Sequence, residues 1–132
     1  MKDFIPYEEA LVLKELGFDE ECLDGYNKYG KLWGMRFDNQ STVNDACSAP
    51  LFSQAFRFFR EKYDLDYSLL PESSSGYKLL DRTYNIVIYK YYVNMNVQAE
   101  IVRIDGKIAR YNKREEAELA CLGKLIEIVK QK

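Results

Sequence analysis

The first periodic stretch of apolar residues lies near the N-terminus. Four residues recur there at helical spacing: Ala10, Val12, Leu13 and Leu16. Pro6 suits the first turn of a helix, where its missing amide proton is not needed, and Gly17 suits a C-terminal cap. The pattern predicts a helix over about residues 6–16.

A second and stronger helical pattern follows Pro50, with Ser48 or Ala49 as the expected cap and Pro50 at the first position. Its apolar row is mostly aromatic: Phe52, Ala55, Phe56, Phe59 and Tyr63. The opposite face is polar: Ser53, Gln54, Arg57, Arg60 and Glu61. An aromatic row of this kind is typical of a helix packed on a core, so we interpret it as structural.

The run from Thr83 to Val93 is the clearest strand, because it is dense in β-branched and aromatic residues. Both of its faces are apolar, which an exposed edge strand does not show. We therefore predict a central strand that is covered on both faces or that presents one face to another chain. Weaker strand patterns lie at 31–37, opposite 23–26, and at 66–70 and 77–80.

The C-terminal third predicts a hairpin and a helix. Strands over 97–104 and 107–111 flank an Asp-Gly pair, which is a strong two-residue turn signal. A helix is expected from Asn112 onward, with a broad apolar face that packs on a sheet. Gly123 lies inside this helix, where it either permits close approach of another element or is merely tolerated. The element order predicts one α+β domain over 1–132, an antiparallel sheet of about four to six strands with three helices mainly on one face.

Composition removes many catalytic classes. The chain has 132 residues and no histidine, which excludes Ser-His-Asp and Cys-His nucleophile pairs and imidazole metal ligands. Its three cysteines, Cys22, Cys47 and Cys121, are widely spaced, so neither a CxxC motif nor a full set of disulfides is available. We expect buried reduced thiols, no metal and no cofactor.

Charge is unevenly distributed although the net charge is −2. Acidic residues dominate 1–24, and basic residues dominate 76–114. Such charge asymmetry affects how the protein associates with other molecules and gives no information about its fold. The N-terminus lacks the pattern of a signal peptide and no apolar run is long enough to span a bilayer, so we expect a cytoplasmic protein without membrane contact.

Three segments carry a resemblance to a known family: FIPYEEALVLKELGFDE at 4–20, SAPLFSQAFRFFREKYDL at 48–65 and REEAELACLGKLIEIVKQK at 114–132. They resemble a family of small proteins of phage and prophage genomes, especially those of Bacteroidetes bacteria. That family has no assigned activity, so it supplies no catalytic residues. The resemblance implies an accessory protein of a mobile element, made in the cytoplasm of a bacterial host cell.

The first function hypothesis is non-enzymatic binding to a host or phage protein. It rests on the two-faced apolar strand and on the 11 tyrosines, because tyrosine offers large and rigid contact area. The alternative is that the tyrosines merely reflect an AT-rich genome. We also expect self-association, with a homodimer formed through the β surface.

The second hypothesis is binding of a nucleotide or a single-stranded nucleic acid, including sequestration of a nucleotide signal, by region 76–114. Aromatic stacking combined with cationic groups holds such ligands. The candidate binding residues are Tyr84, Tyr89, Lys90, Tyr91, Tyr92, Arg103, Lys107 and Arg110. The competing interpretation is a solvated rim over core tyrosines, since no nucleic-acid motif occurs.

An enzyme is the third class and the least favoured. Adjacent carboxylates such as Glu8-Glu9 and Glu115-Glu116 diverge on a helix instead of meeting at one substrate atom. We therefore assign no catalytic residue.

Overall fold

A computed structural model describes residues 4–34, 36, 39, 46–73, 82–92, 96–104 and 106–131. The chain divides into two compact units, Met1–Phe58 and Phe59–Lys132. We call them the N-terminal and the C-terminal unit and describe each by itself. That residues 1–132 form one domain stays a prediction.

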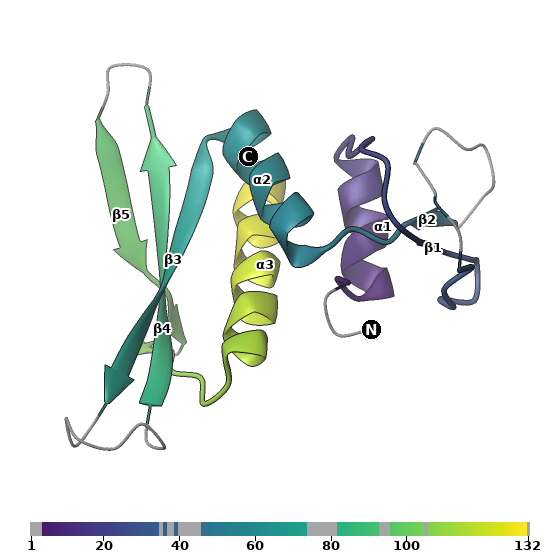
Figure 1. The fold of residues 1–132 in the computed structure, drawn as a ribbon. Coiled ribbons are helices and arrows are strands. Elements are labelled where there is room, and N and C mark those ends of the chain that lie inside the picture. The colour runs from purple at the N-terminus through teal and green to yellow at the C-terminus, as the bar shows by residue number, and fades with distance from the viewer. Residues whose placement is uncertain are drawn as a thin grey trace. The chain divides into compact units, whose positions relative to one another are not determined.

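The N-terminal unit begins with helix α1, Tyr7–Glu15, labelled in Figure 1. It confirms the helix predicted over 6–16, although Pro6 is the N-cap and not part of the first turn. Ala10 and Leu13 are fully buried on its inner face. The helix packs against the short strand β2 of the same unit.

The end of α1 shows why Gly17 is needed there. The Gly17 N–H donates to the Lys14 carbonyl at 3.1 Å, and the Phe18 N–H donates to the Leu13 carbonyl at 2.9 Å. This is the Schellman arrangement, and it requires the positive φ of 98° that Gly17 adopts. Leu13 and Phe18 are both buried, so the motif that ends the helix also places two side chains in the core of this unit.

Two short strands, β1 (Gly25–Tyr26) and β2 (Cys47–Ser48), pair in antiparallel fashion. The strand expected over 31–37 is replaced, in its described part, by one bridge between Leu32 and Tyr26. Gly30 and Gly34 explain why the pairing with β1 is limited to this bridge. Both glycines have positive φ, so the chain leaves the extended conformation on either side of Leu32. Residues 35 and 37 lie outside the described residues.

Helix α2 (Phe52–Tyr63) confirms the predicted aromatic helix. It begins later than expected, since Leu51 provides the first helical carbonyl, to the Ala55 N–H at 3.0 Å. Ser48 belongs to β2 instead of capping the helix. Phe56 and Phe59 are buried, as the apolar row predicted.

The C-terminal unit contains an antiparallel sheet in the order β3-β4-β5, with β3 at Leu65–Ser73, β4 at Arg82–Tyr91 and β5 at Val97–Ile101. The central position predicted for the run 83–93 is confirmed by β4. The strand predicted over 66–70 is found as part of β3. The strand predicted over 77–80 lies outside the described residues.

The predicted hairpin is present as two-residue strands, β6 (Arg103–Ile104) and β7 (Lys107–Ile108). Gly106 has a φ of 80°, the conformation that an Asp-Gly turn provides. After the hairpin the chain returns to β4, where Tyr111 and Tyr84 exchange backbone hydrogen bonds of 3.1 and 2.8 Å.

Helix α3 (Arg114–Lys130) lies along one face of this sheet and contacts β3 and β4 (Figure 1). Its N-cap is Lys113, which makes no side-chain cap bond, so the helix begins at Arg114 and not at the expected Asn112. The buried residues are those of the predicted apolar face: Ala117, Cys121, Leu122, Leu125, Ile126 and Val129. The α+β class, with three helices and antiparallel strands, is confirmed for the described part of the chain.

Gly123 is tolerated in α3 and serves no close approach. A Cβ built there meets no atom within 4 Å, so Gly123→Ala is expected to raise the free energy of unfolding by about 1 kcal/mol, the difference in helix propensity. Urea unfolding measures this change. Gly17→Ala is the control and is expected to lower stability because of its positive φ. A destabilised Gly123→Ala protein would show that the glycine has a packing role.

Candidate binding surface

The alternation of side chains along the strands divides the C-terminal sheet into two different faces. The face toward α3 carries Leu65, Ile86 and Ile88, which are 1%, 0% and 6% exposed. The strand register places Ile88 beside Glu100 of β5 and Tyr67 of β3 on that face. This helix-covered face is the core of the unit.

The other face, which we call the open face, is mostly apolar and largely exposed. Alternation places these residues on it: Asp66, Ser68, Leu70, Thr83, Asn85, Val87, Tyr89, Tyr91, Val97, Ala99 and Ile101. Leu70, Tyr91 and Val97 are 45%, 42% and 53% exposed. Only Val87 is buried among the apolar side chains of the face, at its centre. No helix of the C-terminal unit lies on the open face within the described ranges, because α3 occupies the opposite one (Figure 1).

Cross-strand pairs join the apolar residues of the open face into one patch. Val87 lies opposite Ile101, Tyr89 opposite Ala99, and Tyr91 opposite Val97. Pairs of aromatic and aliphatic residues across adjacent strands contact one another directly. The patch is therefore continuous across β4 and β5 and not a scatter of single exposed residues.

The structure separates the eight residues predicted from region 76–114. Tyr89 and Tyr91 lie on the open face, whereas alternation puts Tyr84, Lys90 and Tyr92 on the side of α3. The Tyr92 hydroxyl donates to Gln98 Oε1 at 2.9 Å, which agrees with that placement.

The three remaining predicted residues, Arg103, Lys107 and Arg110, belong to the β6–β7 hairpin and the residues after it. Arg103 and Arg110 are exposed, and Arg103 Nη1 donates to the Gly106 carbonyl at 3.4 Å. For Lys107 the structure describes the backbone, which pairs with Ile104. Of the predicted set, strand alternation in β4 thus places Tyr89 and Tyr91 on the open face and Lys90 on the opposite one.

A small hollow of about 140 Å³ lies on the α3 side of the sheet. It is lined by Leu65, Ile88, Lys90, Gln98, Glu100 and Ile128. Ligand pockets usually measure about 300–1,000 Å³, so this hollow is small for an organic ligand.

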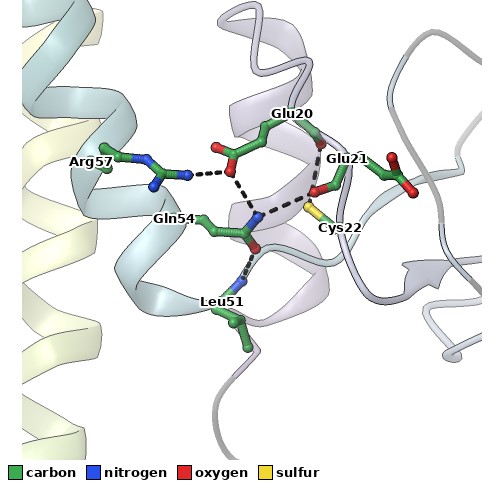
Figure 2. Close-up of polar contacts among 6 residues, drawn as sticks. All are labelled: Glu20, Glu21, Cys22, Leu51, Gln54 and Arg57. Carbon is green, nitrogen blue, oxygen red and sulfur yellow. Dashed lines mark hydrogen bonds and ion pairs between the residues drawn. The ribbon is translucent and has the colours of Figure 1, made fainter.

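A polar cluster joins residues 20–22 to the start of α2 within the N-terminal unit (Figure 2). Gln54 Oε1 accepts from the Leu51 N–H at 2.9 Å, which is one half of a capping box. Its Nε2 donates to Glu20 Oε1 at 3.1 Å and to the Glu21 carbonyl at 3.3 Å. Arg57 forms an ion pair with the same Glu20 oxygen. Every polar atom of the Gln54 side chain thus has a partner within the fold.

A hollow of about 240 Å³ lies beside this cluster, lined by Glu21, Cys22, Leu23, Arg36, Leu51 and Gln54. Arg36 Nη1 lies 3.5 Å from Glu21 Oε1, so the two charged groups of the lining face one another. With its charges and amide engaged in this way, the cluster is best explained as a clamp that fixes the start of α2.

The three thiols are buried and free of disulfides, as the sequence predicted. Burial raises the pKa of Cys22 and Cys47 to about 11 and that of Cys121 to about 12. A thiol is nucleophilic as the thiolate, so none of these groups is activated near neutral pH. Burial also raises the pKa of Tyr26 and Tyr67.

In the part of the chain that the structure describes, no three cysteine or acidic side chains are placed to hold a metal ion. No helix there is long and apolar enough to cross a membrane.

Sequence reasoning missed the contribution of β5 to the surface. The alternation of Val97, Ala99 and Ile101 with Gln98 and Glu100 is visible in the sequence. It predicts one apolar and one polar face for β5, and the register adds the apolar face to that of Tyr89 and Tyr91. The missing information was the pairing partner of β5.

Comparison with known proteins gives no match. No protein-family model matches the chain, and no significant match was found among curated proteins or among solved structures.

Proposed function

We propose that the chain is a non-enzymatic binding protein that contacts a partner protein through the open face. The observation that carries this proposal is the continuous and exposed apolar patch on β4 and β5, which includes Tyr91, Val97 and Ile101. Large exposed apolar patches on soluble domains mark interaction sites. Burial of such a patch under a partner removes apolar area from water and so favours association.

The character of the open face favours a protein over a nucleotide or a nucleic acid. Tyr89 and Tyr91 have the aliphatic neighbours Val87, Val97 and Ala99 across and along the strands. Nucleic-acid binding depends on Lys and Arg near the phosphates. Tyrosine beside aliphatic side chains is instead typical of the centre of a protein interface.

The resemblance to phage and prophage proteins suggests the setting. We propose an accessory protein that acts in the cytoplasm of a bacterial host on a host or phage protein. The lack of histidine and the neutral state of the buried thiols support a role in binding and not in catalysis.

Site-specific photo-cross-linking tests this function. A photoreactive phenylalanine analogue at Tyr91 is expected to give one discrete product with a separate protein in a lysate of a Bacteroidetes host. The same analogue at Leu119, which is 38% exposed on α3, is the matched control and is expected to give none. Excess unmodified chain is expected to abolish the product by competition.

Specificity for the open face is tested with a second competitor. Excess V97D/I101D is expected to leave the product in place, because two carboxylates disrupt the apolar patch. Three results would contradict the proposal: no product from Tyr91, equal products from Tyr91 and Leu119, or a product formed only between two copies of this chain.

A further inference from the structure

We propose that the outer edge of β5 binds the same edge of a second copy of this chain, so that two sheets join as one. This goes beyond the proposed function, because it concerns the edge of the sheet and not its open face. β5 ends the strand order β3-β4-β5, and all five of its residues are exposed. An exposed strand edge presents unpaired N–H and C=O groups to another strand.

The hydrogen bonds to β4 show which backbone groups of β5 point outward. The Tyr92 N–H donates to the Asn96 carbonyl and the Val102 N–H donates to the Ile86 carbonyl, both at 2.9 Å. Because hydrogen-bonded positions alternate along an antiparallel ladder, the even-numbered residues 96–102 bond to β4. The N–H and C=O groups of Val97, Ala99 and Ile101 therefore point away from the sheet.

The two edges of the sheet differ in how they are protected. At β3 the Tyr91 N–H donates to the Asp64 carbonyl at 3.0 Å, so the odd-numbered residues of β3 face outward. Pro71 is one of them, and it offers no N–H to a further strand. Natural sheets use proline and lysine to block edge pairing, and β5 (Val97–Ile101) contains neither.

The sequence of β5 is complementary to itself. In a two-fold antiparallel pair centred on Ala99, Val97 lies opposite Ile101 of the second copy, and Gln98 lies opposite its Glu100. Apolar side chains thus meet on the open face, and an amide meets a carboxylate on the other face. The two Glu100 carboxylates are diagonal to one another, so the pairing places no like charges directly opposite.

Analytical ultracentrifugation of the purified chain tests the dimer without any host protein. The wild type is expected to sediment at submillimolar concentration with twice the 15.5 kDa mass of one chain. Ala99→Pro removes an outward N–H while leaving the bonds to β4, so it is expected to give a monomer. Ala99→Thr keeps that N–H and is the matched control, which is expected to remain a dimer.

A charge exchange keeps the inference testable if the proline variant fails to fold. Gln98→Glu creates two like-charge pairs in each dimer, because each new carboxylate lies opposite Glu100 of the other copy, and it is expected to weaken dimerisation at least tenfold. The glutamate can still accept the hydrogen bond from the Tyr92 hydroxyl. The double variant Q98E/E100Q restores an amide opposite a carboxylate and is expected to recover the wild-type affinity. A monomeric wild type, or Q98E and A99P proteins that dimerise as tightly as the wild type, would overturn the inference.

Discussion

Ile86→Ala is expected to lower the free energy of unfolding by about 2–5 kcal/mol, which is a large part of the 5–15 kcal/mol typical of a domain. Ile86 is fully buried on the central strand β4, on the side that α3 covers. Removal of its three terminal carbons leaves a cavity that close-packed neighbours fill only in part. Urea unfolding followed by circular dichroism measures the change.

Val97→Ala is the control for Ile86→Ala, because it truncates an aliphatic residue of the same sheet. Val97 is 53% exposed on the open face, so the loss of stability is expected to stay below about 1 kcal/mol. The pair therefore separates residues that hold the fold from residues available for binding. A loss at Val97 as large as that at Ile86 would mean that the open face is part of the core.

Alkaline pH is expected to destabilise the protein strongly. The pKa of Cys121 rises from 9.0 to about 12 on burial, so between these values the folded chain keeps a proton that the unfolded chain has lost. Unfolding then releases a proton, and rising pH favours the unfolded state. Each such thiol lowers the free energy of unfolding by about 1.4 kcal/mol per pH unit.

Cys22 and Cys47 act in the same direction up to about pH 11, and the raised pKa values of Tyr26 and Tyr67 add to the effect. Urea unfolding at about pH 8 and about pH 10.5 measures the slope. The variant Cys121→Ala is expected to lose about 2 kcal/mol less stability than the wild type between these two pH values, because the thiol contributes only above its unfolded pKa of 9.0. A free energy of unfolding that stays constant over this range would contradict the prediction.

The elements that the sequence predicted well are those whose pattern repeats several times. The helices α2 and α3 present apolar rows over three or more turns, and in both helices the middle of the row is buried. The run at β4 is apolar on both faces, and β4 is central. When apolar residues recur at the same spacing over several turns, that spacing identifies the secondary structure more reliably than a short run can.

The short elements could not be predicted because they depend on distant contacts. β1 and β2 have two residues each and pair across about 20 positions of the chain. The cap of α2 likewise depends on Gln54, whose amide also reaches Glu20 and Glu21 from a distant loop. Neither pairing leaves a periodic signal in the local sequence.

The candidate site was predicted in part. Tyr89 and Tyr91 were named and lie on the open face, whereas Val97, Ala99 and Ile101 were not. Strand alternation alone would have separated Lys90 from its two tyrosine neighbours. What the sequence lacks is the register of β5 against β4, which decides which side chains share a surface.

Pro71 also limits how far an assembly of this chain can grow. Among the strands that the structure describes, two copies joined at β5 present β3 edges at the ends of the combined sheet. A strand arriving at such an end meets a residue that cannot donate its amide proton, which interrupts the ladder that a fibril requires. The placement of one proline thus favours closure at a pair over a filament.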